Sequence, residues 1–235
     1  MSRSRPNNNI SNPAKRTMEW KGSIGKWEWW DRDAKEKRHV ESVRFAVLDQ
    51  LASVCGYAEA FNASGFSNEV HSTKREPLQV KVFRGKGKVE TVARGLYSDI
   101  KGDLPKGLKF AKIIYALDVD TDEIVRLILQ GAALNQWIEL DVNVNGLVKQ
   151  TGTIEGKKGA VTFQMPVFEE EEITQAQEEA AVEADQLVQD YLDSKKALQE
   201  AQPEPEVEPE PATSPITKPE PKDDEDEDDT DSIPF

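Results

Sequence analysis

Basic and aromatic side chains alternate with apolar ones in several short stretches of this sequence, in a pattern that suits contact with a single nucleic-acid strand. Lysine and arginine neutralise phosphates, and an aromatic ring stacks on an unpaired base for about 1–3 kcal/mol. Stacking accepts every base, so such a site does not need to read sequence. The residues predicted to make these contacts are Lys26, Trp30, Lys81, Phe83, Arg84, Lys86, Lys88, Arg94 and Tyr97.

The other large aromatics are predicted to build the core, because such side chains dominate protein interiors. Trp20, Trp27, Trp29 and Trp137 belong to this group. Phe83 is predicted to lie beside Lys81 on the face of its strand that carries the polar residues, which is unusual for a purely structural phenylalanine. A partly buried strand residue is the alternative interpretation of Phe83.

Signatures of catalysis are missing from the sequence. The glycine-rich segment at 85–87 lacks the spacing and the Lys-Ser/Thr pair of a P-loop. A single cysteine, Cys55, excludes an intrachain disulfide and is predicted to be a small core residue. The two histidines, His39 and His71, are predicted to lie in loops and suggest no metal centre. We therefore expect no enzyme, no cofactor and no metal.

The C-terminal end combines charge with apolar side chains. Seven consecutive carboxylates, residues 223–229, are followed by Asp231 and then by Ile233, Pro234 and Phe235. A tail that only kept the chain in solution would not need an apolar end. The acidic run can lie against a basic groove, while the last residues enter an apolar pocket edged by cations. Asp231, Ile233, Pro234 and Phe235 are thus predicted to bind a partner protein.

This ending resembles the C-terminal tip of bacterial and bacteriophage single-stranded-DNA-binding proteins. The resemblance covers residues 223–235 and favours a divergent bacteriophage type. It implies an OB-fold domain, a low-complexity linker and an acidic tip that recruits replication or recombination enzymes. Single-stranded DNA is then the expected ligand, with double-stranded DNA left open as a second one.

Charge is unevenly distributed along the chain. Residues 1–168 carry 26 basic and 20 acidic side chains, whereas residues 169–235 carry 4 and 24. The overall pI of 4.7 conceals this asymmetry. Such a division predicts a domain that binds a polyanion and a tail that competes with it. The start lacks the apolar segment of a signal peptide, and no stretch is long enough to span a membrane, so a cytoplasmic protein is expected.

The elements that must position these residues are mostly short strands separated by glycine-rich turns. The expected strands are 18–30 with a glycine bulge, 42–57, a hairpin of 78–83 and 89–97 around a turn at 84–88, then 110–117, 124–129, and a pair within 139–168 that turns at 155–159. A helix from Val43 to Tyr57 is the alternative interpretation of the second of these segments. A short helix is expected from Gly131 and carries Trp137, whereas residues 31–41 and 58–77 are expected to be loops. These elements predict an all-β fold, and the resemblance of the tip favours an OB-fold-like antiparallel barrel over a sandwich.

Five segments follow from this division. They are a flexible basic arm at 1–17, the OB-fold-like nucleic-acid-binding domain at 18–168, an amphipathic helix at 169–201, a Pro/Glu linker at 202–222 and the acidic tip at 223–235. The linker and tip are expected to be disordered. The helix can dock on the barrel or pair with a copy of itself, which leaves a homo-oligomer open.

The function favoured by these features is coating of single-stranded DNA during bacteriophage replication or recombination. Three alternatives remain at this point. The chain could bind single- and double-stranded DNA alike, or could be a protein-interaction or chaperone-like module with an acidic tail. It could also be a metal nuclease that uses the carboxylates of Asp118, Asp120 and Asp122, although aspartate is common in turns.

Overall fold

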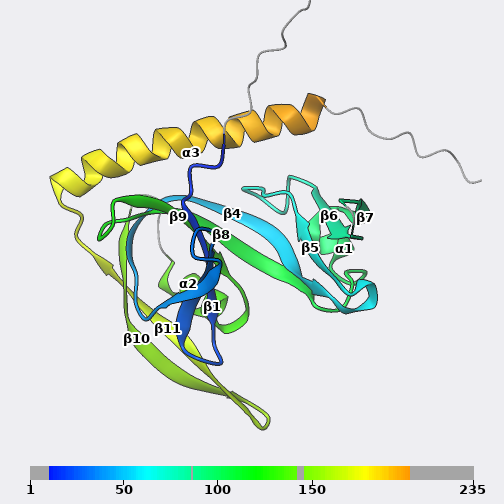
Figure 1. Cartoon of the computed structure of the whole chain (residues 1–235), viewed down its shortest axis with the longest axis horizontal. Coiled ribbons are helices and arrows are strands. Elements are labelled where there is room, and N and C mark those ends of the chain that lie inside the picture. Colours follow the sequence, from blue (N-terminus) through cyan, green and yellow to red (C-terminus); the bar gives the residue numbers. More distant parts are fainter. Residues whose placement is uncertain (1–10, 86, 142–145, 202–235) are drawn as a thin grey trace, which may run out of the picture.

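A computed structural model describes residues 11–85, 87–141 and 146–201 (Figure 1). The strands are β1 (Arg16–Lys21), β2 (Lys26–Asp31), β3 (Glu36–Val40), β4 (Arg44–Ala58), β5 (Ala63–Ser67), β6 (Leu78–Phe83), β7 (Val89–Gly95), β8 (Leu108–Asp118), β9 (Glu123–Leu129), β10 (Leu147–Lys158) and β11 (Val161–Glu171). The helices are α1 (Tyr97–Ile100), α2 (Gly131–Leu140) and α3 (Gln175–Ala201). The predicted linker, the predicted tip and most of the predicted arm lie outside the described residues.

The strands form one mixed sheet with the order β3-β2-β1-β9-β8-β4-β5-β6-β7, and β10 pairs with β4 and β11. The prediction of an all-β fold with a C-terminal helix is confirmed in its coarser part, since the fold is mostly β and ends in α3. The prediction of a closed antiparallel barrel is wrong, because the sheet is open and β1 runs parallel to β9. Between β1 and β11 the described residues form no ladder. Two hydrogen bonds bridge the gap, from Gln164 N to Gly22 O at 2.7 Å and from Trp20 Nε1 to Gln164 O at 2.9 Å.

The sheet has a central set of five strands and three further strands inserted between two of them in the sequence. Strands β4, β8 and β9 form a meander, α2 follows, and the β10–β11 hairpin returns to pair with β4. Strands β5, β6 and β7 lie between β4 and β8 in sequence and extend the sheet beyond β4 (Figure 1). The inserted strands therefore share a continuous surface with the centre.

The main core lies between the curled sheet and α2. Trp27 and Trp137 are buried there, and the ring of Trp137 stacks on that of Phe45 at 5.9 Å. Each buried indole N–H has a partner, since Trp27 donates to Gln150 Oε1 and Trp137 donates to Gln50 Oε1. Trp20 and Trp29 pack against the same core and are half-buried. The prediction that these four tryptophans are structural is confirmed.

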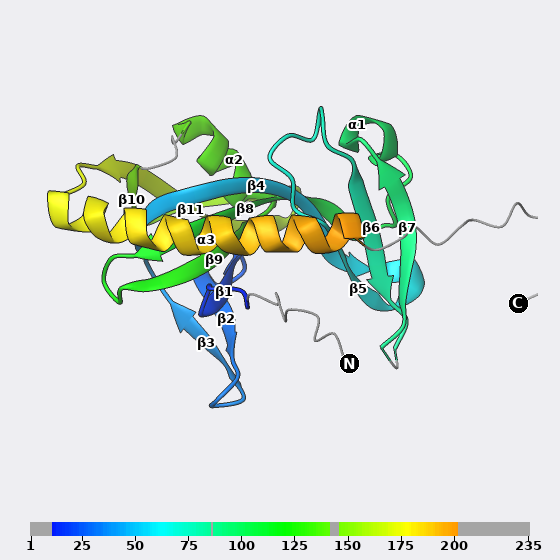
Figure 2. The ribbon, with the colours of Figure 1, turned by 90° about the horizontal axis from the view of Figure 1, so that it is seen from above.

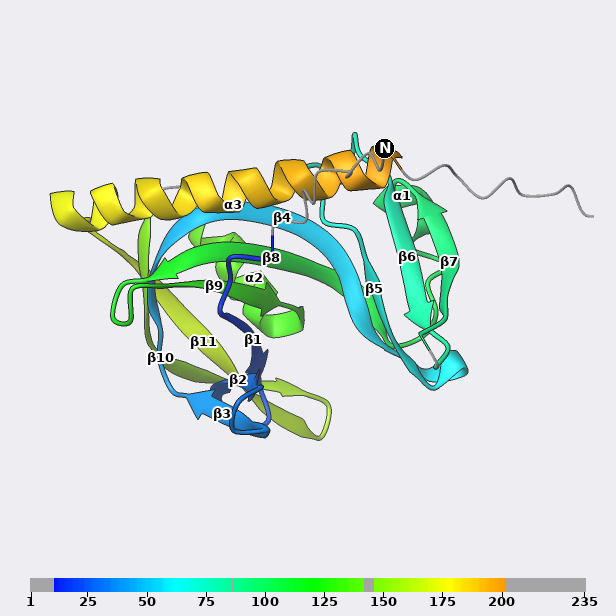
Figure 3. The same cartoon turned by 45° about the horizontal axis from the view of Figure 1, so that its top comes forward.

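Helix α3 docks on the opposite face of the sheet. Ala184 and Val188 are buried against the outer side chains of β4 and β8, and Tyr191 packs at the edge of the same cluster. At the start of α3, Thr174 and Gln177 exchange hydrogen bonds through a capping box. Figures 2 and 3 show α3 crossing the sheet from the β10–β11 end to β6. Of the two predicted arrangements for the helix, the structure shows docking.

Four local predictions are corrected by the structure. Residues 18–30 form the β1–β2 hairpin rather than one bulged strand, because Gly25 takes a φ of 64° in a tight turn. The turn still places Trp20 and Trp27 on the core face, with Lys21 and Lys26 opposite. Residues 31–41 and 58–77, expected to be loops, contain β3 and β5. Strand β11 continues to Glu171, so α3 begins later than predicted. In the described part of the chain, every helix is too short or too polar to cross a membrane.

Candidate nucleic-acid interface

One face of the sheet gathers aromatic and basic side chains from neighbouring strands. Across β6, β5, β4 and β8, ladder pairing aligns Lys81 with Phe66, Phe66 with Cys55, and Cys55 with Lys109. Side chains two residues apart on a strand share a face. Phe83 therefore lies beside Lys81 on β6, and Tyr57 beside Cys55 on β4. We call Tyr57, Phe66, Lys81, Phe83 and Lys109 the aromatic–lysine face.

The three aromatic rings of this face are open to solvent. The exposed fractions are 52% for Tyr57, 36% for Phe66 and 46% for Phe83. The rings of Phe66 and Phe83 lie 5.1 Å apart with 33° between their planes. On the other side of the same strands, Val80 and Val82 are fully buried. The alternation of β6 thus buries its aliphatic residues and leaves its aromatic and basic ones in water, where bases could stack on the rings.

The lysines of the face are available to an anion. Lys109 is exposed and Lys81 half-exposed, and neither forms an ion pair with another side chain in the described ranges. The thiol of Cys55 lies between them and accepts a hydrogen bond from Gln130 at 3.4 Å. Burial, with a smaller contribution from Glu19, raises the pKa of this thiol to about 11. Cys55 is therefore uncharged at neutral pH and adds nothing to the charge of the face.

A glycine holds the backbone at the edge of this face. Gly107, just before β8, has a φ of 97°, and a Cβ there would lie 1.9 Å from the carbonyl oxygen of Tyr57. Any other side chain would have to displace the backbone of Tyr57. Gly107 therefore fixes the close approach of β4 and β8 that presents the tyrosine.

The predicted contact residues divide into those that the face brings together and those that it does not. Lys81 and Phe83 belong to the face, and Lys88 is exposed at the turn that follows it. Lys26 and Trp30 lie on β2, towards the opposite end of the sheet. Trp30 is 58% exposed, but Lys26 is engaged with Glu41 at 2.9 Å.

Other predicted contacts have structural partners instead. Arg84 pairs with Glu90, and its guanidinium lies over the ring of Phe61. Tyr97, predicted to lie on the return strand, begins α1, and its ring packs against Phe110 at 5.0 Å. The prediction for Tyr97 is corrected, since β7 ends at Gly95.

The remaining predicted contact residues either lie away from the aromatic–lysine face or fall outside the residues that the structure describes. Arg94 is exposed on β7 and borders a separate cleft between β6 and α3. Lys86 and the predicted partner-binding residues Asp231, Ile233, Pro234 and Phe235 lie outside the described residues.

Sequence reasoning missed Tyr57, Phe66 and Lys109. Phe66 was hidden because its segment, rich in Asn, Ser and Gly, reads as a loop although Ala63–Ser67 forms β5. The signal that could have revealed it is the alternation of small residues with Phe66. Such a segment can form a strand when a large side chain from elsewhere packs against the face that carries the small residues. Leu108 supplies that side chain at Gly65.

The aspartates considered as a metal site have another role. Asp118 is nearly buried and pairs with Arg16 at 2.9 Å, and Arg16 also contacts Glu123 at 3.1 Å. Asp118 further accepts a hydrogen bond from the backbone of Asp120, which is typical of a turn. Across the part of the chain that the structure describes, no cluster of acidic, histidine and cysteine side chains could hold a metal ion. Arg16, predicted to belong to the flexible arm, is a structural residue of β1.

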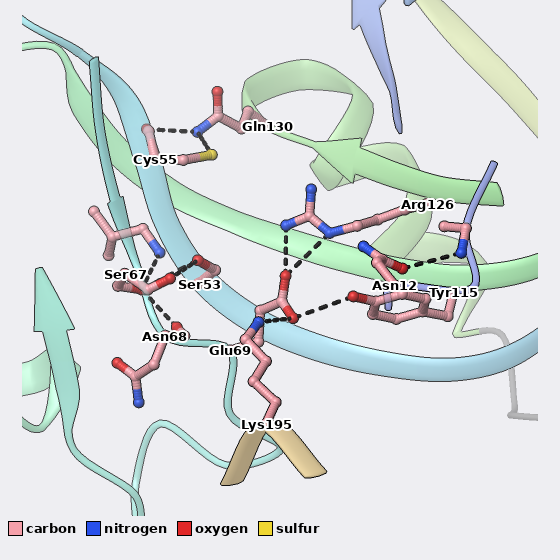
Figure 4. A network of polar contacts seen from close by, with 12 residues as sticks. Asn12, Ser53, Cys55, Ser67, Asn68, Glu69, Tyr115, Arg126, Gln130 and Lys195 are labelled. Atoms are coloured by element: carbon pink, nitrogen blue, oxygen red, sulfur yellow. Dashed lines mark hydrogen bonds and ion pairs between the residues drawn. The ribbon is translucent and has the colours of Figure 1, made fainter. Parts of the chain in front are cut away.

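A buried ion network joins α3 to the sheet next to this face (Figure 4). The side chain of Glu69 is 5% exposed and pairs with Arg126 of β9 and with Lys195 of α3 at 2.9 Å. The hydroxyl of Tyr115 also donates to Glu69. Burial alone would raise the pKa of Glu69, but the charges of Arg126 and Lys195 outweigh it and hold the pKa below its usual range.

Fold and face together define a mostly β protein with an open mixed sheet, a docked C-terminal helix and an exposed aromatic–lysine face. No protein-family model, no curated protein and no solved structure matches the chain.

Proposed function

We propose that this protein binds single-stranded DNA through the aromatic–lysine face. The carrying observation is the set of three solvent-exposed rings beside two lysines on adjacent strands. Aromatic rings that are exposed to water are unfavourably solvated, and a group of them marks a binding surface. A polyanion with unpaired bases is a ligand that can contact the rings and the cations at the same time. A duplex hides its bases and would use only the lysines.

The strand order supports an OB-fold-like assignment. An OB-fold is a five-stranded, partly open Greek-key barrel that binds oligonucleotides on its second and third strands and the adjoining loops. Here β4, β8, β9, β10 and β11 take these five places, with α2 between the third and the fourth. The inserted strands β5–β7 then occupy the loop between the first and second strands, where an OB-fold contacts its ligand.

The acidic tail completes the proposal. Coating of single strands during replication or recombination, in a bacteriophage, agrees with the resemblance of the tip to that of single-stranded-DNA-binding proteins. Figures 2 and 3 show that α3 ends beside β6, where Lys195, Lys196 and Gln79 line one cleft, so α3 ends near the aromatic–lysine face. The tip would recruit partner enzymes, and we propose no catalytic role for the chain.

A salt titration of DNA binding tests the proposal. Affinity for oligo-dT should fall with salt at a log–log slope of about −0.7 per neutralised phosphate. Replacing Lys81 and Lys109 with alanine should make that slope shallower by about 1.4, measured by fluorescence anisotropy in the full-length chain. Lys101→Ala, at an exposed site off the face, should leave the slope unchanged.

Two results would reject this assignment. One is a slope near zero in the wild type, which would remove the electrostatic contribution. The other is equal affinity for duplex and single strand, which would favour the general DNA-binding alternative.

Recruitment by the tip has its own expected outcome. Phe235→Ala should leave affinity for oligo-dT within about twofold, because the side chain carries no charge, yet should abolish capture of a partner whose pocket is apolar and edged by cations. The measurement is a pull-down of replication proteins with wild-type and Phe235→Ala chains. Identical sets of captured proteins would show that the tip does not recruit.

A further inference from the structure

A cleft lies between the C-terminal half of α3 and the segment that joins β5 to β6. Its volume is about 600 Å³, within the range of about 300–1,000 Å³ that small ligands occupy in proteins. Leu51 and Val70, both buried, form its floor, and Leu192 of α3 lines one wall. The cleft therefore offers an apolar surface on which a single flat ring can lie.

The cleft continues the aromatic–lysine face along β6. Gln79 lines the cleft, and Lys81 and Phe83 follow it on the same side of the strand, since side chains two residues apart share a face. Ladder pairing places Arg94 of β7 next to Gln79, and Arg94 also lines the cleft. A DNA strand bound across Phe83 and Lys81 would therefore reach the cleft at Gln79.

The charges that line the cleft cancel one another. Three are carboxylates and three are cations, namely Glu69, Glu76, Asp193, Arg94, Lys195 and Lys196. His71, which also lines the cleft, contacts the carboxylate of Asp49 at 3.0 Å. A cleft with balanced charges gives no track for a row of phosphates. It suits a neutral base whose phosphates stay outside, next to Lys81 and Arg94.

Two side chains on one turn of α3 supply polar groups at the wall of the cleft. Asp193 and Lys196 are both exposed, and neither forms an ion pair or a side-chain hydrogen bond within residues 11–85, 87–141 and 146–198. Residues three apart on a helix are neighbours, so a carboxylate acceptor lies beside an ammonium donor. The carboxylate of Glu69, by contrast, is engaged by Arg126 and Lys195 (Figure 4). Asp193 and Lys196 are therefore available to a ligand.

We propose that the cleft binds one guanine of the bound DNA strand, an inference that rests on the proposed function. The ring would lie against Leu51, Val70 and Leu192, which exclude water from its face. Guanine has two adjacent donor groups, N1–H and the N2 amino group, for the two oxygens of Asp193. Its O6 and N7 are acceptors for the ammonium group of Lys196.

The same two residues discriminate against the other bases. Thymine has a single N3–H between two carbonyl oxygens, so one of these oxygens would face the carboxylate of Asp193. Cytosine and adenine offer the carboxylate one amino group beside a ring nitrogen that is itself an acceptor. Stacking on the aromatic–lysine face accepts every base, so the protein would bind any single strand and hold it most tightly with guanine in the cleft.

Short oligomers that differ at one base test the cleft. Labelled oligo-dT and the same oligomer with a central dG, dC or deoxyinosine, which lacks the N2 amino group, are titrated by anisotropy against the full-length chain. The dG oligomer should bind at least about fivefold more tightly than oligo-dT, since a bidentate contact to a base discriminates by at least that factor. The dC and deoxyinosine oligomers should bind within about twofold of oligo-dT.

Two substitutions on α3 assign the preference to the cleft. Asp193→Asn should abolish it, so that the dG oligomer and oligo-dT bind alike, because an amide cannot accept from both donor groups. Glu183→Gln removes an exposed carboxylate of the same helix that does not line the cleft, and it should keep the full preference. The helical signal and the unfolding temperature of both variants should match those of the wild type, since both side chains are exposed.

Several outcomes would overturn the inference. Equal affinity for the dG oligomer and for oligo-dT would exclude a guanine site and leave the proposed function intact. A preference that persists in Asp193→Asn, or an equal gain from deoxyinosine, would show that this carboxylate does not read the base. Absence of binding to every oligomer would reject the proposed function together with the guanine site, so the two failures are distinguishable.

Discussion

Replacing Phe66 and Phe83 together with alanine is expected to weaken binding of single-stranded DNA by about 30-fold or more. Each base that stacks on an aromatic ring contributes about 1–3 kcal/mol, so two lost platforms remove at least about 2 kcal/mol. Both rings are exposed, and the valines on the opposite side of β6 are fully buried, so the fold should tolerate the change. Binding to duplex should change by less than about threefold. The measurement is anisotropy of labelled oligo-dT and of a duplex at one salt concentration.

Controls separate stacking from a change in folding. Ile138→Ala removes an apolar side chain that is 61% exposed on α2, away from the face, and should leave affinity unchanged. Thermal unfolding of the double variant should match that of the wild type within a few degrees. Wild-type affinity in a folded Phe66→Ala/Phe83→Ala chain would show that these rings are not base platforms.

Substitution of Trp30 tests how far along the sheet the proposed DNA site extends. Trp30 lies on β2, six strands from β6 in the order of the sheet, and is as exposed as the rings of the face. Glu19 of β1 lies between them and forms an ion pair with Lys21 at 2.7 Å, so this pair offers phosphate no net positive charge. A loss of affinity in Trp30→Ala comparable to that of Phe83→Ala would extend the site across the whole sheet.

Local alternation predicted the elements that bury one face. The clearest case is β6, where Leu78, Val80 and Val82 alternate with polar residues and are fully buried. The turn glycines of β1–β2 were recognised, but a bulge and a tight turn use glycine alike. The pairing of Trp20 with Trp27 shows that the glycines form a tight turn and not a bulge. This contact joins two strands, so the residue pattern of a single strand cannot predict it.

Long-range pairing explains what the sequence could not predict. The parallel contact of β1 with β9 joins residues more than a hundred positions apart and prevents the simple antiparallel closure. Strand β3, with the sequence Glu-Lys-Arg-His-Val, has no apolar alternation, and backbone pairing to β2 alone makes it a strand. In the same way, Phe66 and Lys109 share the aromatic–lysine face only because β5 and β8 both pair with β4.

Replacing Glu69 with alanine is expected to lower the free energy of unfolding by about 3–5 kcal/mol. Arg126 has a side chain that is 18% exposed and relies on Glu69 for its ion pair, and removal of one partner leaves the other charge largely buried and uncompensated. The unfolding temperature should fall by about 6–20 °C for a domain of this size. Glu59→Ala breaks the exposed pair with Lys106 and should cost at most about 1 kcal/mol. Urea unfolding of the three chains at pH 7 measures both effects.

The pH dependence of stability identifies the origin of that loss. The pKa of Glu69 lies below its value in the unfolded chain, so its contribution is complete above about pH 4.3 and is lost as the pH falls through the folded-state pKa. The wild type should therefore lose stability below about pH 4 more steeply than Glu69→Ala, which has no such group. Parallel curves for the two chains between pH 5 and pH 3 would mean that the buried carboxylate is not ionised in the folded state.

A second substitution distinguishes an uncompensated charge from lost packing. If the cost of Glu69→Ala arises from the unpaired guanidinium, then Glu69→Met combined with Arg126→Leu should recover most of the lost free energy, because an apolar pair of similar volume avoids burying any charge. Arg126→Leu alone should leave Glu69 with Lys195 and cost less than Glu69→Ala. The same double variant removes the ion network that joins α3 to the sheet, so it also measures how strongly this network contributes to docking of the helix. If the helical signal is lost at a lower urea concentration than tryptophan burial in the double variant but not in the wild type, then α3 detaches first without the network and Glu69 holds the helix on the sheet.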